Sequence, residues 1–169
     1  MKIVLNNNRI TLRSLESYDI DWLLLVENNT EYWKVSGTTK AFTRETITSY
    51  VALAQENIST ALQYRFVIER ENIRVGLIDL FDYDSINNKV GVGILVLTKF
   101  QNTGVGDSAL RLLMEYCVNQ LKIELVYANI AETNLPSIRL FKNNEFLLTP
   151  QKASKNHFDK SILLFQKKC

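Results

Sequence analysis

The sequence predicts an α/β fold in which a mixed, mostly antiparallel central sheet carries helices on both faces. Short alternating or apolar runs typical of strands are separated by helical patterns, and a strand, glycine turn, helix and strand follow one another between residues 90 and 130. That succession favours one parallel, right-handed crossover within the sheet. A length of 169 residues suits one domain with a substantial core, so residues 1–169 are predicted to form a single domain.

Each predicted element rests on a local pattern. Ile10 and Leu12 alternate with polar neighbours as in a strand, whereas apolar residues between 20 and 26 recur at helical spacing. Ser17, Thr43 and Asn134 are residue types that cap helix N-termini. The predicted elements are a strand over 9–13, a helix from Ser17 to about 28–30, a loop with Tyr32, Trp33 and Gly37, a helix from Thr43 to about Ile58, strands over 64–69 and 73–82 joined by a Glu71-Asn72 turn, a strand over 90–97, a helix over 107–121, a strand over 124–130, a helix over 135–144, and strands around Phe146 and over 158–165.

The most informative segment is Gln101–Gly106, which joins the strand over 90–97 to the helix over 107–121. Backbone N–H groups at a helix start lack intrahelical partners, and together with the positive end of the helix dipole they bind phosphate. Gly104 and Gly106 lack the Cβ atoms that would hold a pyrophosphate away from the backbone. The segment predicts a site for a phosphorylated ligand, and a turn with glycines for geometry alone is the competing interpretation.

The spacing of the segment argues against two common phosphate-binding motifs. A mononucleotide P-loop needs Lys-Ser/Thr after its last glycine, and no such pair follows Gly106. The dinucleotide fingerprint belongs near the start of a βαβ unit, whereas most of this chain precedes the segment.

Gln101, Gly104 and Gly106 fill the defining positions of a Gln/Arg-x-x-Gly-x-Gly/Ala pattern, which resembles the acetyl-coenzyme A motif of the GNAT N-acetyltransferases. Residues 134–141 are similar to the family's Asn-x-x-Ser/Ala-x-x-Leu-Tyr/Phe segment, and the runs 65–68 and 75–81 resemble its central hairpin. The resemblance covers roughly residues 9–150 in the family's order and spacing. It is nearest to the spermidine/diamine and the ribosomal-protein N-terminal acetyltransferases.

This resemblance implies acetyl-coenzyme A as acyl donor and direct attack by a primary amine in a ternary complex. The cofactor-binding residues that it implies are Leu95, Val96, Leu97, Gln101, Asn102, Thr103, Gly104, Val105, Gly106, Asn134 and Phe141. A non-catalytic coenzyme A-binding module is an alternative, because the strand over 90–97 has no acid and Phe141 replaces the family's usual tyrosine.

Acetyl transfer to an amine requires the amine to lose a proton. For an amine of pKa ~10.4 this costs about 4.6 kcal/mol at pH 7, and a carboxylate acting through water is the expected helper. Asp79 is the candidate base because an uncompensated charge in its apolar run would be expensive; a salt-bridged structural aspartate is the alternative. Phe141 cannot donate a proton, and the resemblance implies Ser137 as the acid instead, because it matches a serine that some N-terminal acetyltransferases use; a serine in the first turn of a helix is the alternative interpretation.

Acceptor recognition is predicted at Glu27, Glu31, Tyr32 and Trp33, where two carboxylates lie beside two aromatic residues. Carboxylates beside aromatic rings favour binding of a cationic amine, so a diamine or polyamine is the predicted acceptor. A protein N-terminus is the alternative acceptor. The competing interpretation is an exposed helix end with aromatic residues packed beneath it. Glu145, where relatives have glycine, and Asp107, an acid beside the phosphate turn, depart from the family pattern; Asp107 is expected to point away from the pyrophosphate.

Composition excludes several other classes of function. The net charge of +2 is spread along the chain, which argues against nucleic acid as a partner. No run approaches the ~20 apolar residues of a membrane span, and the N-terminus is too short and polar for a signal peptide. Two cysteines and one histidine, His157, offer neither a disulfide framework nor a zinc site. We expect a cytoplasmic enzyme with a small-molecule amine as partner and no metal; its oligomeric state, homo-oligomers included, is left open.

Overall fold

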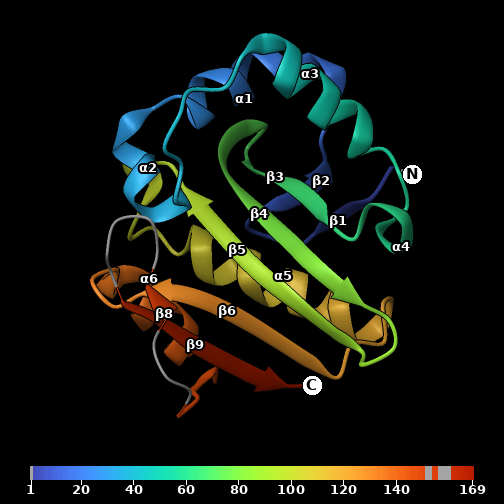
Figure 1. The fold of residues 1–169 in the computed structure, drawn as a ribbon. Helices are drawn as coiled ribbons and strands as arrows, with labels where there is room; N and C mark the ends of the chain where they lie inside the picture. The colour runs from blue at the N-terminus through green and yellow to red at the C-terminus, as the bar shows by residue number, and fades with distance from the viewer. Residues whose placement is uncertain (1, 151–153, 156–160) are drawn as a thin grey trace.

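The computed structural model describes residues 2–150, 154–155 and 161–169, so His157 and the start of the strand predicted over 158–165 lie outside the described residues. Figure 1 shows the arrangement of the elements. In chain order these are β1 (Val4–Asn6), β2 (Thr11–Ser14), η1 (Ser17–Asp19), α1 (Ile20–Glu27), α2 (Thr30–Ser36), α3 (Arg44–Leu53), α4 (Ile58–Ala61), β3 (Tyr64–Arg70), β4 (Ile73–Asp84), β5 (Lys89–Val96), η2 (Thr98–Phe100), α5 (Val105–Asn119), β6 (Leu125–Ala131), α6 (Leu135–Asn143), β7 (Leu147–Leu148), β8 (Ser154–Lys155) and β9 (Ser161–Lys168).

Within the described part of the chain, nine strands form one sheet in the order β1-β2-β3-β4-β5-β6-β9-β7, and β8 pairs with β9. All neighbouring strands are antiparallel except β5 and β6, which confirms the mixed, mostly antiparallel sheet. The parallel pairing joins residues 89–91 to residues 125–127 only. Beyond it β5 and β6 diverge, as Figure 1 shows, so residues 92–96 of β5 have no strand partner on that side among the described residues.

Helices cover both faces of the sheet, as predicted (Figure 1). On one face, Leu110 and Leu113 of α5 belong to the same buried cluster as Ile78 of β4. On the other face, the second cluster joins α1, α2 and α3 to Val67 and Leu77. Because side chains alternate along a strand, Asp79 lies on the same face as Leu77, toward α1–α3. Asp79 of strand β4 therefore lies on the face of the sheet opposite α5.

Several local predictions are confirmed by backbone geometry. Glu71 and Asn72 have φ values of 53° and 62°, as a tight hairpin turn between β3 and β4 requires. The Thr43 side chain accepts a hydrogen bond from the Thr46 N–H and caps α3. Asn134 caps α6 through the Ser137 N–H.

Other local predictions were wrong. The expected loop around Tyr32 and Trp33 is helix α2, capped by Asn29 and ended by Gly37 at φ 75°. The single helix expected from Thr43 to Ile58 is two helices, because Asn57 caps a new one at Ile58. Ser17 caps nothing in the described structure; it begins the short 3-10 turn η1, and α1 starts three residues later. Strand β1 was not predicted. The strand predicted around Phe146 is present as β7, directly after the buried Phe146.

Glu145, one of the departures from the family pattern, occupies a left-handed conformation with φ 66°. Its carboxylate pairs with the Lys167 ammonium at 2.8 Å, but the Glu145 side chain is 83% exposed. So exposed an ion pair contributes little to folding stability, whereas a positive φ destabilises the fold when the residue carries a Cβ.

We therefore expect Glu145→Gly to raise the melting temperature by about 2–4 °C, the shift that corresponds to relief of left-handed strain in a domain of this size. Glu145→Ala is the matched control, because it loses the same ion pair and keeps the strain. Calorimetry should rank the glycine variant above wild type and the alanine variant at or below it; equal stability of the two variants would contradict the argument.

Candidate active site

A groove with a cavity volume of about 460 Å³ lies where β5 separates from β6. Its walls come from β5, the Gln101–Gly106 segment, α6 along its whole length and one residue of α2. The predicted cofactor residues that line it are Leu95, Val96, Gln101, Asn102, Gly104, Gly106 and Asn134, together with the predicted acid Ser137. An open strand edge and a helix N-terminus thus meet in one elongated groove.

The N-terminus of α5 is built to accept an anion. Its N-cap Gly104 has φ 81°, and in the described structure no side chain caps this end of the helix. A Cβ placed on Gly104 would meet no atom within 4 Å, so the space in front of the first amides is open. The first amides of a helix have no intrahelical partner. Gln101 supports the turn by donating from Nε2 to the Val96 carbonyl at 3.1 Å.

Asp107 lies in the first turn of α5 and lines the groove. Its carboxylate pairs with Arg111 one turn along α5 and accepts a hydrogen bond from Asn144 Nδ2 at 2.9 Å. These two partners lie along α5 and at the end of α6, so the carboxylate is held by groups other than the open amides. Asp107 nevertheless lines the groove, so its orientation away from the pyrophosphate stays a prediction.

Four predicted cofactor residues do not line the groove: Leu97, Thr103, Val105 and Phe141. Leu97 donates its N–H to the Val75 carbonyl and so belongs to the sheet. Thr103 and Val105 line a different cavity. Phe141 is 2% exposed and packs edge-on against Phe146, with ring centroids 5.0 Å apart, because α6 turns this side chain into the core.

Sequence reasoning missed some groove residues. They include Val35 of α2, Ile94, Phe100, Pro136, Arg139, Leu140 and Asn143. Arg139, Leu140 and Asn143 are three and four residues apart on α6, so helical spacing could have suggested a shared face. Val35 had no such signal, because the segment was taken for a loop. Its approach to β5 depends on tertiary packing.

On the opposite side of the sheet, Arg65 is held between two carboxylates. Its Nε donates to Asp79 Oδ1 at 2.6 Å and its Nη2 to Asp79 Oδ2 at 2.7 Å, a bidentate pair. Its Nη1 also bonds Glu27 of α1. The guanidinium lies 5.1 Å from the ring centroid of Tyr50 on α3. We call Glu27, Tyr50, Arg65 and Asp79 the Arg65 cluster.

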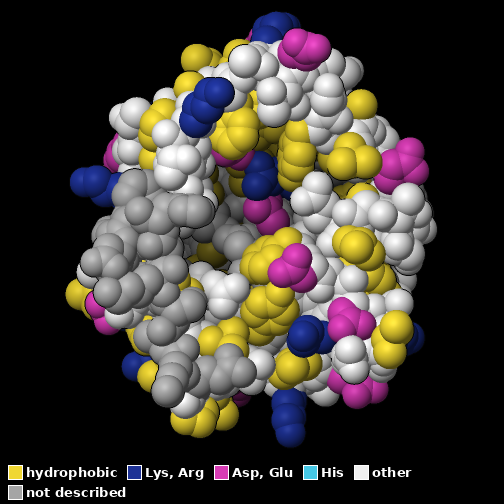
Figure 2. Space-filling model, viewed as in Figure 1, with side chains coloured by type: hydrophobic (Ala, Val, Ile, Leu, Met, Phe, Trp, Pro, Cys, Tyr) yellow, Lys and Arg dark blue, Asp and Glu magenta, His cyan; other side chains and the backbone are white. Residues whose placement is uncertain are grey.

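The Arg65 cluster carries one positive and two negative charges. Burial opposes the Arg65 charge, but Asp79, Tyr50 and Glu27 together raise the pKa of Arg65, so it stays protonated. Burial, opposed by the Arg65 charge, raises the pKa of Tyr50 to about 12, so its hydroxyl stays neutral near pH 7. A surplus negative charge beside aromatic surface favours a cationic group. Figure 2 shows a hollow on this side of the molecule with charged side chains of both signs at its bottom.

The cluster reaches the groove across strand β5. A Cβ built on Gly93 would lie 3.8 Å from Asp79 Oδ2, and Gly93 is paired with Asp79 in the sheet. The carboxylate of the neighbouring strand therefore lies where β5 has no side chain of its own. Leu95, the next residue of β5 on the same face as Gly93, lines the groove.

The predicted acceptor residues are brought together, but most have structural partners. Trp33 Nε1 donates to the Glu27 carbonyl at 2.8 Å. Thr98 donates its hydroxyl to Glu31 Oε1 at 2.6 Å and its backbone N–H to the Tyr32 hydroxyl at 3.2 Å. Helix α2 is thereby tied to the start of the segment that leads into the glycine turn. Tyr32 is buried, whereas Glu31 is exposed.

Comparison with known proteins identifies the family. Residues 9–147 match the model of the acetyltransferase (GNAT) domain, and the chain belongs to this family. It is therefore an acetyltransferase, and acetyl-coenzyme A is its acyl donor. The open amides of α5 and the free edge of β5 fit that donor.

Among curated relatives, spermidine N(1)-acetyltransferase of Escherichia coli K12 is 22% identical over 81% of this chain and 72% of its own length. The Vibrio cholerae enzyme of the same name is 23% identical over 83% and 80%. Among solved structures, spermidine N-acetyltransferase from Vibrio cholerae in complex with CoA and spermine aligns with a TM-score of 0.86 at 17% identity, covering 96% of each chain. The ribosomal L7/L12 alpha-N-protein acetyltransferase RimL aligns equally well, with a TM-score of 0.86 at 15% identity, covering 100% of this chain and 96% of that one.

In the described part of the chain no helix is both long and apolar enough to cross a membrane.

Proposed function

We propose that this protein transfers the acetyl group of acetyl-coenzyme A to a primary amine of a small molecule, by direct attack in a ternary complex. The observation that carries the proposal is the meeting of two sites on one face of β5: Leu95 lines the groove, and Asp79 of the Arg65 cluster lies over Gly93, two residues earlier. The donor lies along the free strand edge with its diphosphate at the N-terminus of α5. The amine approaches from the α1–α3 side.

Asp79 is the proposed proton acceptor. Both of its oxygens accept from Arg65, and each carboxylate oxygen keeps a second lone pair for a water or the amine. The bidentate pair fixes the orientation of the carboxylate, and the surplus negative charge of the cluster attracts an ammonium ion. The sequence analysis gave a salt-bridged structural aspartate as the alternative to a base. In this proposal Asp79 has both roles, because it is paired with Arg65 and also accepts the proton.

Ser137 is the proposed donor of a proton to the leaving thiolate. It lines the groove in the first turn of α6, and its hydroxyl forms no hydrogen bond within the described residues. A buried phenylalanine at position 141 leaves no acid there. Since a thiol of pKa ~8.5 leaves readily, this step needs less help than deprotonation of the amine.

A diamine or polyamine is the proposed acceptor, supported by the spermidine acetyltransferase relatives and by the acidic residues of this face. Glu27 is committed to Arg65, so the exposed Glu31 is the carboxylate proposed to bind the distal ammonium. The RimL likeness supports a second candidate, the N-terminus of a protein.

Glu31→Gln should raise the Michaelis constant for a diamine by about two- to fivefold, the effect of one partly exposed ion pair, and leave a monoamine of equal length nearly unaffected. Thr98→Val is the matched control, because it removes the same hydrogen bond and keeps the Glu31 charge. If the two variants change the Michaelis constant for the diamine equally, Glu31 serves only to hold α2 in place and does not bind the distal ammonium.

An acceptor panel read by release of free thiol tests the function as a whole. Polyamines, monoamines and peptides with free N-termini should be compared at equal concentration. Turnover restricted to peptides would overturn the small-amine proposal in favour of the protein N-terminus. Tight binding of coenzyme A with no turnover on any amine would favour the non-catalytic module.

A further inference from the structure

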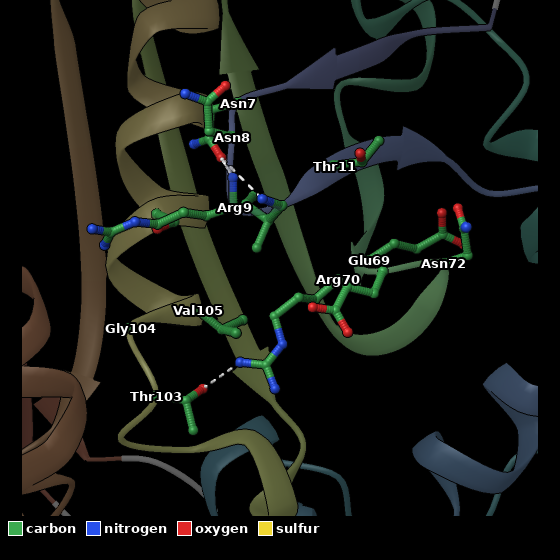
Figure 3. Close-up of a pocket in the computed structure, with 13 residues that line it drawn as sticks. Asn7, Asn8, Arg9, Thr11, Glu69, Arg70, Asn72, Thr103, Gly104 and Val105 are labelled. Atoms are coloured by element: carbon green, nitrogen blue, oxygen red, sulfur yellow. Dashed lines mark hydrogen bonds between the residues drawn. The ribbon is translucent and has the colours of Figure 1, made fainter.

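A second cavity, of about 520 Å³, lies beside the first turn of α5. It is formed by the β1–β2 turn, the β3–β4 hairpin and residues 103–108, three segments far apart in the sequence (Figure 3). Gly104 lines both this cavity and the groove, whereas Thr103, Val105 and Ser108 line only the second. The loop that faces the groove is thus shared with a separate polar cavity.

Arg70 brings an uncompensated positive charge to this cavity. Figure 3 shows its side chain extending from the end of β3 toward Thr103, and Nη1 donates to Thr103 Oγ1 at 3.3 Å. The guanidinium lies 5.4 Å from the Phe100 ring centroid, and Arg70 forms no ion pair with any described carboxylate. The adjacent Glu69 is already paired with Arg13 at 2.8 Å.

Ser108 supplies an unused hydroxyl in the same cavity. The residue is 6% exposed, and its side chain forms no hydrogen bond to any residue in the described ranges. No fully buried side-chain polar atom of the described residues lacks a hydrogen-bond partner, so the Ser108 hydroxyl oxygen is accessible from the cavity that the residue lines. A ligand oxygen is the partner that the cavity has room for. Asn8 and Asn72, in the two turns, add amide groups at the rim.

We propose that this cavity binds a small phosphate monoester. The phosphate group is held by the Arg70 guanidinium and the Ser108 hydroxyl near the positive end of α5, and the rest of the molecule contacts the turn amides. This ligand is distinct from acetyl-coenzyme A, which occupies the groove. Because Arg70 also bonds Thr103 of the cofactor loop, the two sites are coupled.

The expected coupling is negative. Two anions close to one helix N-terminus repel each other, and solvent screening reduces that repulsion, so occupancy of the cavity should weaken acetyl-coenzyme A binding by about two- to threefold. By thermodynamic linkage, bound cofactor lowers the affinity for the phosphate ligand by the same factor.

The test uses the full chain with saturating coenzyme A, so that the groove is filled. Inorganic phosphate and glycerol 3-phosphate are then titrated at constant ionic strength, with melting temperature and calorimetric binding as readouts. We expect saturable binding that Arg70→Gln abolishes and Glu71→Gln strengthens, because Glu71 adds a negative charge to the cavity wall. Lys99→Gln is the matched control: Lys99 lies over the same Phe100 ring but does not line the cavity.

Three outcomes would overturn the proposal. Binding of phosphate that disappears once coenzyme A saturates the protein would mean that phosphate occupied only the groove. Equal binding by Arg70→Gln and wild type would remove the proposed contact. If Arg70→Gln weakens the binding of coenzyme A but not of 3′-dephospho-coenzyme A, Arg70 binds the 3′-phosphate of the cofactor and there is no second site. None of these outcomes depends on which amine is acetylated.

Discussion

Gly104→Val should weaken acetyl-coenzyme A binding on the order of 100-fold and abolish the stabilisation that the cofactor gives to the wild-type protein. A branched side chain at the N-cap of α5 fills the open space in front of the first amides and disfavours φ 81°. Two lost charge-assisted hydrogen bonds of ~1.5–3 kcal/mol each account for a loss of this size. Calorimetric titration gives the affinity, and the ligand-dependent shift in melting temperature gives an independent measure.

Gly37→Val is the control for strain alone. Gly37 ends α2 at φ 75°, and a Cβ there also meets no atom within 4 Å, so the substitution imposes similar strain away from the glycine turn. Gly106→Ala should keep most of the affinity, because its Cβ would lie 3.4 Å from a flexible Leu140 methyl. Unchanged binding by Gly104→Val, or an equal loss in Gly37→Val, would show that this turn does not hold the diphosphate.

Asp79→Asn should lower turnover about 100-fold at pH 7, within the range for loss of a general base, while leaving acetyl-coenzyme A affinity intact. The deficit should shrink as the pH rises toward the ~10.4 pKa of the acceptor amine, because more of the amine is then already neutral. A pH–rate profile of wild type and variant measures this directly.

The same substitution removes one charge from the Arg65 cluster, so its effect on folding has to be measured separately. Glu27 still balances Arg65, and we expect a loss of about 1–3 kcal/mol in unfolding free energy. Asp82→Asn is the matched control on the same strand; Asp82 accepts a hydrogen bond from the Tyr127 hydroxyl at 2.9 Å and lies outside the cluster. A turnover loss in Asp79→Asn that is equal at every pH would assign Asp79 a purely structural role.

Local signals determined much of the fold. The Glu71-Asn72 turn, the Asn134 cap and the apolar strands were predictable because each depends on neighbours within a few residues. The helix around Tyr32 had such signals too, an Asn29 cap and the ending Gly37, but the polar residues 28–30 were interpreted as the end of a helix that is followed by a loop. The break between α3 and α4 was missed because the helical pattern continues weakly through Asn57.

The glycine turn and the family were likewise readable from the sequence, because phosphate binding by a helix N-terminus needs only a short contiguous motif. The pairing of Asp79 with Arg65 joins adjacent strands, and the Glu27 contact and the Glu31–Thr98 bond join residues 38 and 67 positions apart in the chain. Composition cannot reveal such partners, since an isolated carboxylate and a paired one look the same in a sequence. Whether a predicted acid is free, paired or tied to a neighbouring helix was decided only when the sheet brought these segments together, because charge and hydrogen-bond energies depend on distances that the tertiary structure sets.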